Sequence, residues 1–279
     1  MKSTLNVNGK ILKLTSPQIV GILNVTPDSF FDGGQYEQME AIIARAAAML
    51  EAGADWLDVG GYSSRPNATP ITVEEELHRV IPTIKAIQST FPTSKISVDT
   101  FRAEVANKAV QAGAHMINDI SGGTLDDKMF ETVAALQVPY ILMHMRGNPQ
   151  TMQSQTTYEN ILVDILSYFR KKILKLEGLG VKDIIIDVGL GFAKTLTQNY
   201  FLLNHLEYFK RLNKPLLVGA SRKSMIYKLL GITPSLALNG TTAVNTLALC
   251  KGANLLRVHD VKEAKEVVTI FEQLSTSSD

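Results

Sequence analysis

Polar and ionisable residues recur at the ends of short apolar segments along this chain. Asp and Asn are common at such places because their side chains bond to nearby backbone, but His, Lys and Arg are not typical turn residues. A ring of carboxylates, amides and cations would suit a small polar ligand that is partly anionic. In chain order the residues are Asn24, Asp58, Asp99, Asn118, Asp119, His144, Asp187, Ser221, Arg222, Lys223, Arg257 and His259.

Three segments partly match motifs for nucleotide binding or covalent catalysis, but each lacks a required residue. Residues 189–194 (GLGFAK) lack the final Gly of a dinucleotide fingerprint, and residues 193–195 (AKT) lack the Gly that precedes the Lys of a phosphate loop. Residues 219–223 (GASRK) end in Lys where a nucleophile elbow needs Gly. The five histidines show no zinc-type spacing. We therefore expect chemistry without a covalent enzyme nucleophile or a protein metal cluster.

Short apolar segments rich in β-branched residues alternate with longer amphipathic ones. Eight such pairs predict a (β/α)8 TIM barrel of the α/β class, in which reactive side chains project from the carboxyl ends of the strands. An open doubly wound sheet is the alternative, although it usually has fewer strands. The expected strands are 19–25, 56–59, 96–98, 115–120, 138–143, 183–188, 215–218 and 254–258, and the expected helices are 38–52, 73–90, 102–112, 127–136, 158–178, 198–211, 224–250 and 261–274.

Local signals support this pattern. Residues 72–75 (TVEE) form a capping box that marks a helix start. Residues 5–12 (LNVNGKIL) predict a short N-terminal β-hairpin with an Asn-Gly turn, which could cover the bottom of the barrel. Because composition does not change along the chain, residues 1–279 are expected to form a single domain.

The composition is that of an ordinary soluble globular protein. Hydrophobic residues make up 45% of the chain and the net charge is +1, which gives no electrostatic signature for nucleic acid or an anionic membrane. No apolar run is long enough to span a membrane and the start has no signal-peptide core, so a cytoplasmic location is expected. Cys250 excludes an internal disulfide, and we expect it to be buried in a helix.

Seven short motifs follow one another along the chain: residues 24–34 (NVTPDSFFDGG), 60–66 (GGYSSRP), 97–100 (SVDT), 117–120 (INDI), 143–149 (MHMRGNP), 221–225 (SRKSM) and 257–259 (RVH). Any one of them is a weak signal. The ordered set covers nearly the whole chain and resembles dihydropteroate synthase. That family is a (β/α)8 barrel and condenses 6-hydroxymethyl-7,8-dihydropterin diphosphate with 4-aminobenzoate. The products are diphosphate and 7,8-dihydropteroate, in folate biosynthesis, and sulfonamides compete with the aminobenzoate.

The resemblance implies a role for most of the polar ring. Carboxylate and amide groups match the donors and acceptors along the edge of a pterin, whereas Arg suits bidentate contact with phosphate. The family also binds Mg²⁺ on the diphosphate and on Asn24. The implied pterin-binding residues are Asp99, Asn118, Met143, Asp187 and Lys223, and the implied diphosphate-binding residues are Asn24, Ser64, Arg257 and His259.

The resemblance further implies a reaction through a carbocation-like state, with Asp99, Lys223, Arg257 and His259 as the catalytic groups. Such a reaction needs no enzyme nucleophile, which fits the absence of one. Two loops would close over the diphosphate, build the aminobenzoate pocket and exclude water. The implied aminobenzoate-binding residues are Thr26, Pro27, Phe30, Arg65, Pro66 and Ser224.

A few positions depart from the commonest family pattern. Tyr62 stands where an acidic residue is frequent, Ser64 replaces Thr, and Asn67 replaces Gly beside the aminobenzoate pocket, which leaves sulfonamide sensitivity open. Residues 188, 190 and 193 also differ, being Val, Leu and Ala. A pterin-binding methyltransferase barrel and a non-catalytic pterin-binding paralogue are the alternatives, and a homodimer through the apolar segment 236–249 is possible.

Overall fold

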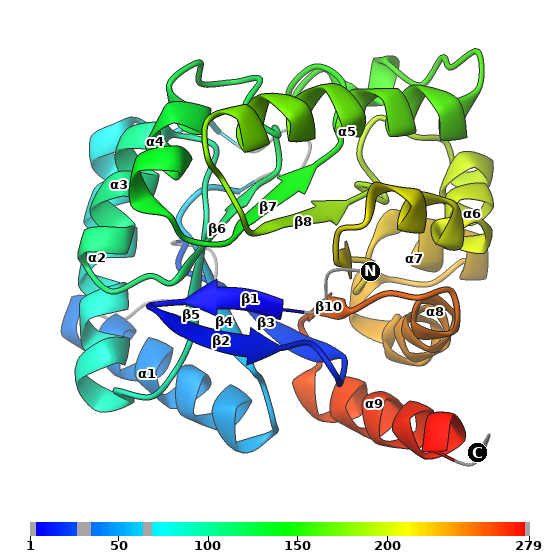
Figure 1. Ribbon diagram of the computed structural model, residues 1–279. Coiled ribbons are helices and arrows are strands. Elements are labelled where there is room, and N and C mark those ends of the chain that lie inside the picture. Colours follow the sequence, from blue (N-terminus) through cyan, green and yellow to red (C-terminus); the bar gives the residue numbers. More distant parts are fainter. Residues whose placement is uncertain (1–3, 27–34, 64–68, 277–279) are drawn as a thin grey trace.

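Eight parallel strands close into a barrel in the computed structural model, which describes residues 4–26, 35–63 and 69–276, with residues 35–37, 275 and 276 as backbone only (Figure 1). Neighbouring strands follow one another in sequence, and β10 closes the sheet against β3. The predicted barrel is thereby confirmed, and the alternative prediction of an open doubly wound sheet is wrong. The barrel strands are β3 (Gln18–Asn24), β4 (Trp56–Gly60), β5 (Ile96–Asp99), β6 (Met116–Asp119), β7 (Tyr140–Met143), β8 (Ile184–Asp187), β9 (Leu216–Val218) and β10 (Leu255–Val258).

The helices surround the barrel, each after its strand. The sequence predicted one long helix over 224–250, but the structure divides this segment. Gly231 adopts a left-handed φ of 66° and ends the first helix, and Pro234 opens a short 3-10 turn before the next. The α-helices are α1 (Gln35–Glu51), α2 (Val73–Thr90), α3 (Ala103–Gln111), α4 (Met129–Leu136), α5 (Ile161–Gly178), α6 (Leu196–Asn204), α7 (Ser224–Leu230), α8 (Leu238–Cys250) and α9 (Val261–Thr276), and the 3-10 helices are η2 (Met152–Ser154), η3 (Leu206–Leu212) and η4 (Pro234–Leu236).

Two local predictions about the ends of these elements can be compared with the structure. The predicted capping box is present, because Thr72 Oγ1 accepts a hydrogen bond from the backbone N–H of Glu75, whose carboxylate accepts one from the N–H of Thr72. The expectation that Cys250 is buried was wrong. Cys250 is the last residue of α8 and is exposed, whereas Leu249 before it is buried. No helix in the described part of the chain is both long enough and apolar enough to cross a bilayer.

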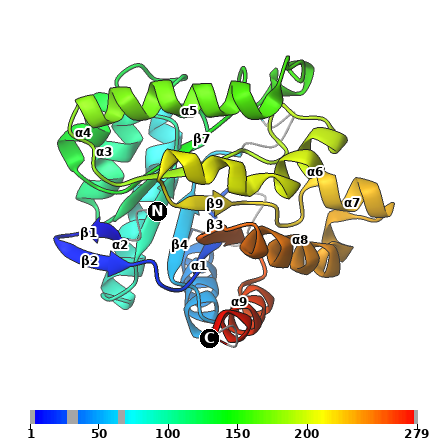
Figure 2. The ribbon, with the colours of Figure 1, turned by 45° about the vertical axis from the view of Figure 1, so that its right-hand side comes forward.

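The predicted hairpin is formed by β1 (Thr4–Val7) and β2 (Lys10–Lys13), drawn in dark blue in Figures 1 and 2. Its turn residues Asn8 and Gly9 both have positive φ, 49° and 78°, as a two-residue hairpin loop requires. Leu5 and Val7 are buried together with the inward-facing residues at the start of the barrel strands, among them Trp56. The hairpin therefore closes the bottom of the barrel, as expected.

The strands of the barrel alternate between two environments. On β4, Leu57 and Val59 face the helices and belong to the large outer core, whereas Trp56 belongs to the smaller core inside the barrel. The lower inward layer is apolar on most strands and is formed by Val20, Trp56, Met116, Ile141, Ile185, Leu217 and Leu255. Two residues further along each strand, the inward positions lie at the carboxyl end of the barrel, where most of them are polar.

Candidate active site

The upper inward layer of the barrel brings most of the sequence-predicted residues together. Because side chains alternate along a strand, the residue two positions after each lower-layer residue must also point inward. Strand pairing aligns Asn24 with Gly60, Gly60 with Asp99, and Asp99 with Asn118 across three adjacent strand pairs. The inward residues at this end are Ile22, Asn24, Asp58, Gly60, Asp99, Asn118, Met143, Asp187, Gly219 and Arg257.

Arg257 on β10 lies at the centre of the polar contacts in this layer. Its Nε donates to Asp58 Oδ2 at 2.6 Å, and its Nη2 donates to Asp99 Oδ2 at 2.5 Å. Asn118 Nδ2 donates to the same Asp58 oxygen at 3.0 Å, which leaves the Asn118 amide oxygen as an acceptor. Nη1 of Arg257 has no acceptor among the described residues, so the guanidinium keeps donors for a ligand.

Asp58 is the site residue to which sequence reasoning gave no role. Its carboxylate is fully buried and orients both Arg257 and Asn118 through one oxygen. The other oxygen, Oδ1, has no hydrogen-bond partner in the described part of the chain. The available signal was its place two residues after Trp56 on the same strand, but an Asp at a strand end is ambiguous without knowledge of its partners.

Two carboxylates share the single guanidinium, and this has an electrostatic cost. Burial, together with the charges of Asp58, Glu76 and Asp119, raises the pKa of Asp99 to about 7 against the opposing effect of Arg257. The same two carboxylates raise the pKa of Arg257, although burial opposes them. Arg257 is therefore a permanent cation, whereas Asp99 can change protonation near neutral pH.

Lys223 and Asp187 form the second charged part of the site. Lys223 Nζ donates to the carbonyl oxygen of Leu190 at 2.7 Å and lies 4.7 Å from the centroid of the Phe192 ring. Burial lowers the pKa of Lys223 to about 8, with the charge of Asp187 acting against it. Burial likewise raises the pKa of Asp187, and Lys223 opposes that shift. The two residues thus stabilise each other's charged forms.

Two glycines give Lys223 and Arg257 the space that they occupy. A Cβ added to Gly191 would lie 3.2 Å from Lys223 Cδ, closer than most carbon contacts. A Cβ added to Gly219 would lie 3.6 Å from Arg257 Cβ and 3.8 Å from Lys223 Nζ. These distances also place the Lys and the Arg on the same side of β9, although 34 positions separate them in the sequence (257 − 223).

His259 follows β10 and is bound to Ser221. The backbone N–H of His259 donates to Ser221 Oγ at 3.1 Å, and Nδ1 of the ring lies 3.1 Å from the same oxygen. Burial and the nearby charge of Arg257 lower the pKa of His259 to about 4, so the imidazole is neutral at neutral pH. With the Ser221 hydroxyl donating to Nδ1, the ring proton lies on Nε2, and this N–H can donate a hydrogen bond to an anion.

The site also has an apolar wall. Met143 is 2% exposed and packs in a small cluster with Ile120, Phe192 and further side chains, with Phe101 against it. This cluster is separate from the barrel cores and lies next to Lys223 through the Phe192 ring. A methionine and an aromatic ring beside a row of hydrogen-bonding groups would fit a flat heterocycle.

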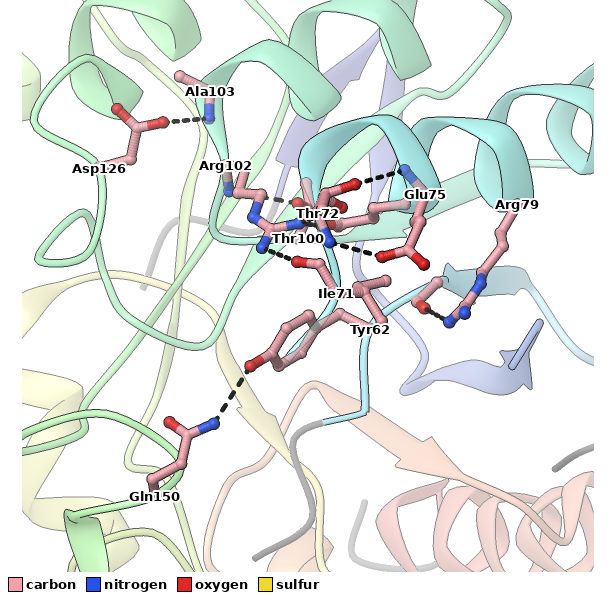
Figure 3. A network of polar contacts seen from close by, with 12 residues as sticks. Tyr62, Ile71, Thr72, Glu75, Arg79, Thr100, Arg102, Ala103, Asp126 and Gln150 are labelled. Carbon is pink, nitrogen blue, oxygen red and sulfur yellow. Dashed lines mark hydrogen bonds and ion pairs between the residues drawn. The ribbon is translucent and has the colours of Figure 1, made fainter. Parts of the chain in front are cut away.

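The rim above β4 and β5 is held by a cluster of polar contacts around Arg102 (Figure 3). Arg102 donates to the carbonyl oxygens of Ile71 and Thr72 at 2.5 and 2.8 Å, and also forms an ion pair with the buried Glu76 at 2.8 Å. Its guanidinium lies 5.5 Å from the Tyr62 ring centroid, and the Tyr62 hydroxyl accepts a hydrogen bond from Gln150 at 3.3 Å. Tyr62, a departure from the family pattern, therefore bridges two loops of the rim.

Two strand-end residues of the sequence pattern lie outside the site. Asp119 follows Asn118 and so faces the opposite side of β6, where it accepts a hydrogen bond from Tyr140 at 2.7 Å. His144 follows the inward-facing Met143 and is buried on the outer side of the barrel among aromatic rings. The centroids of the His144 and Tyr168 rings are 4.8 Å apart. Their polarity serves internal contacts rather than a ligand, and the pattern of strand ends alone could not separate them from the inward residues.

The remaining sequence-predicted residues belong to the two loops and to the start of α7. Thr26 follows β3 and Ser224 begins α7, and both are partly buried. The other loop residues lie outside the described residues; these are Pro27, Phe30, Ser64, Arg65 and Pro66, together with the departure Asn67.

No group of three or more His, Cys, Asp or Glu side chains in the described part of the chain could hold a metal ion. A single amide ligand is a different case. Asn24 Oδ1 and Asp99 Oδ2 lie 3.6 and 3.7 Å from the point that a Cβ of Gly60 would occupy, so the glycine leaves both oxygens uncovered on that side. One protein oxygen beside phosphate oxygens and waters is a donor set that suits Mg²⁺, and Asn24 fits it.

Comparison with known proteins agrees with this geometry. The sequence profile of the family described as "Pterin binding enzyme" matches residues 20–259. A dihydropteroate synthase of Escherichia coli (strain K12) is 44% identical over 266 residues, which are 95% of this chain and 94% of that protein.

Solved structures give the same result. The Yersinia pestis dihydropteroate synthase in a sulfonamide drug complex superposes with a TM-score of 0.92 at 40% identity, covering 98% of this chain and 99% of that one. The Xanthomonas albilineans dihydropteroate synthase with 4-aminobenzoic acid gives 0.91 at 40% identity, covering 99% of both.

Proposed function

The chain belongs to the pterin-binding enzyme family, with dihydropteroate synthases as relatives over almost its whole length, and on this premise we propose the reaction that it catalyses. As a transferase of folate biosynthesis, it joins 6-hydroxymethyl-7,8-dihydropterin diphosphate to 4-aminobenzoate and releases 7,8-dihydropteroate and diphosphate. The observation that carries the proposal is the inward layer itself. Asp99, Asn118 and Asp187 lie with Lys223 beside the apolar Met143 cluster, and Arg257 adjoins them.

The pterin ring binds between these groups. The carboxylates of Asp99 and Asp187 accept hydrogen bonds from the amino and ring N–H groups, and the free amide oxygen of Asn118 accepts another. Lys223 donates to the acceptor side of the ring, while Met143 packs against its face. Because Asp58 already occupies the Asn118 amide nitrogen, the orientation of Asn118 is set before the ligand arrives.

The diphosphate lies next to Arg257 and His259. Arg257 supplies a permanent positive charge, and neutral His259 supplies one N–H donor. Asn24 and Ser64 complete this part of the site, and Asn24 would hold the Mg²⁺ ion. When bound, that ion neutralises charge on the phosphate oxygens.

The reaction is a substitution at the exocyclic methylene carbon of the pterin. The carbon–oxygen bond breaks and its electron pair leaves with the diphosphate, while the electron-rich ring carries the positive charge. The lone pair of the aminobenzoate nitrogen then forms the carbon–nitrogen bond, and the amine proton is lost to the medium. The Asp99 carboxylate and the Arg257 cation, held in place by their hydrogen bond, stabilise the two developing charges, so no enzyme nucleophile is required.

The aminobenzoate is held by the two loops and by Ser224 at the start of α7. The loop residues are Thr26, Pro27, Phe30, Arg65 and Pro66. Closing these loops over the site keeps water from the carbocation-like state. A sulfonamide that binds to this chain would compete with the aminobenzoate at this place, and Asn67 beside it leaves the sensitivity open.

The test is diphosphate release from the dihydropterin diphosphate with Mg²⁺, measured with and without 4-aminobenzoate. We expect release to depend strongly on aminobenzoate, with dihydropteroate appearing in equal amount. Binding of the pterin diphosphate without any such turnover would instead identify a non-catalytic pterin-binding protein. Methyl transfer from a pterin would favour the methyltransferase alternative.

The chain also forms a homodimer in this proposal, through α7, α8 and the turn between them. Leu229, Leu230, Leu236 and Leu247 are each more than half exposed there, which is unusual for large apolar side chains close together in sequence. Sedimentation at several protein concentrations measures the mass. A monomer at all of them contradicts this part of the proposal, and Leu236→Glu should weaken the dimer if it forms.

A further inference from the structure

Lys194 is a fully enclosed lysine that the proposed reaction does not use. It follows β8 and is 4% exposed. Its Nζ lies 2.9 Å from Gly189 O, 2.8 Å from Phe192 O and 3.1 Å from His144 Nδ1. These three acceptors match the three protons of an ammonium group, and the carbonyl oxygen of His144 lies further from Nζ, at 3.5 Å. No carboxylate among the described residues bonds to Nζ, and burial lowers the pKa of Lys194 to about 7, although the charge of Asp187 opposes this shift.

The contact with Lys194 restricts the tautomer of His144. When Lys194 is protonated it can only donate, so Nδ1 of His144 is then the acceptor and the ring proton lies on Nε2. Burial, together with the charge of Lys194, lowers the pKa of His144 well below its usual range, in agreement with a neutral ring. The aromatic packing of His144 against Tyr168 holds the ring in place.

The segment that encloses Lys194, residues 189–193, has an unusual backbone. Gly189, Gly191 and the non-glycine Ala193 all have positive φ, at 69°, 85° and 49°. For Ala193 this conformation is unfavourable, so the surrounding contacts must stabilise it. The carbonyl groups that point to Lys194 at the two ends of the segment, Gly189 and Phe192, provide such contacts.

The same segment also positions two residues of the pterin site. Leu190 O accepts from Lys223 Nζ at 2.7 Å, and the Phe192 ring lies beneath that ammonium group. The backbone N–H of Gly189 donates to Asp187 Oδ1 at 2.8 Å. Residues 189–193 therefore contact both Lys194 and the Lys223–Asp187 pair.

We propose that Lys194 is a positioning residue for the pterin site, which shapes the 189–193 segment and through it sets the places of Lys223 and Asp187. The inference rests on the proposed function, because it assigns Lys194 to the pterin half of the same reaction. Lys194 touches no reacting atom. It acts by holding the carbonyl of Leu190 and the ring of Phe192 where Lys223 needs them.

The experiment compares Lys194→Met with Lys214→Met in the full chain. Lys214 is also buried and donates to Glu177 at 2.6 Å, but it precedes β9 at the opposite end of the barrel. The probe is 6-hydroxymethylpterin, whose affinity is measured by calorimetry. We expect Lys194→Met to weaken its binding by at least about tenfold, as misplaced binding groups commonly do. The KM for aminobenzoate and the pterin affinity of Lys214→Met should stay close to those of the unmodified chain.

A double-mutant cycle tests the route of the effect. If Lys194 acts through Lys223, Lys194→Met should have much less effect on pterin affinity when Lys223→Met is already present. Effects that multiply independently would overturn the proposal, and so would an unchanged pterin affinity in Lys194→Met.

Two controls keep the result interpretable. Should Lys194→Met not fold, His144→Phe removes the Nδ1 acceptor and keeps the ring packing, and a smaller loss of pterin affinity is then expected. If the unmodified chain itself does not bind the pterin, the proposed function fails, and this outcome is distinct from failure of the inference about Lys194.

Discussion

At the scale of single residues, the site depends on how a few buried charges are shared. Arg257 bonds to both Asp58 and Asp99, and Asp58 also receives the amide of Asn118. A buried carboxylate with two such partners is a positioning group, because removing its charge releases both partners at once. The effect of losing this charge can be measured with an Asp-to-Asn substitution, which replaces one carboxylate oxygen by an amide nitrogen.

Asp58→Asn should lower kcat/KM for the pterin diphosphate by about ten- to a hundredfold, the size of one or two charge-assisted hydrogen bonds. The KM for aminobenzoate should change little. The matched control is Asp55→Asn at the bottom of the barrel, where Asp55 accepts from the backbone of Ile19 at 2.8 Å. That variant should lose stability but keep its activity, and equal kinetic losses in both variants would contradict a local role for Asp58.

Two ionisable groups, Asp99 and Lys223, should determine the pH dependence of kcat/KM. Asp99 is needed as a carboxylate and has its pKa raised to about 7, so kcat/KM should fall as the pH drops through that value. Lys223 is needed as a cation and has its pKa lowered to about 8, so kcat/KM should also fall as the pH rises above it. Lys223→Arg should abolish the alkaline fall, because a guanidinium does not lose its proton there. An alkaline limb that persists in this variant must come from another group.

At the scale of elements, glycines determine where the segments after the strands can pass. Gly189 and Gly231 have nearly the same left-handed backbone, with φ of 69° and 66°. Their surroundings differ completely. A Cβ on Gly189 would lie 2.1 Å from the carbonyl oxygen of His144, whereas a Cβ on Gly231 meets nothing within 4 Å.

Gly189→Ala and Gly231→Ala should therefore differ in kind. Gly231→Ala should cost about 1 kcal/mol of unfolding free energy, the strain of a left-handed alanine, and leave pterin binding intact. Gly189→Ala adds a collision with the His144 carbonyl, which requires a backbone shift at one of these two residues. Because the N–H of Gly189 bonds to Asp187, the change should also reduce pterin affinity. Urea unfolding and calorimetry measure the two quantities, and equal behaviour of the variants would refute the distinction.

At the scale of the whole molecule, the barrel separates stability from chemistry along its axis. The hairpin and the apolar lower layer close one end, and the polar layer with its loops occupies the other. This division is typical of such barrels and predicts that mutations at the two ends affect different measurements.

Leu5→Ala should cost about 2–5 kcal/mol of unfolding free energy, because Leu5 is completely buried between the hairpin and the barrel. The KM values for both substrates should be unchanged in the folded variant. Urea unfolding gives the first quantity and steady-state kinetics the second. A large rise in KM without loss of stability would show that the two ends are coupled.

The sequence by itself determined the periodic features of this protein. Alternation of strands and helices, the Asn8-Gly9 turn and the Thr72 capping box are local patterns, so the barrel and its hairpin could be predicted. The ordered motifs identified the family. The break at Gly231 was missed because a helical pattern continues on both sides of it.

Only the tertiary structure decided which polar groups meet. Asp58 and Arg257 are separated by 199 residues, and no local pattern records that they pair. The strand ends alone did not separate Asn118, which faces the site, from Asp119, which faces away from it. Lys194 resembled a failed phosphate-loop motif, and its role depends on carbonyl groups whose directions are set by the folded backbone. Periodicity is a property of neighbouring residues, whereas hydrogen-bond partners across a closed barrel exist only once the barrel has closed.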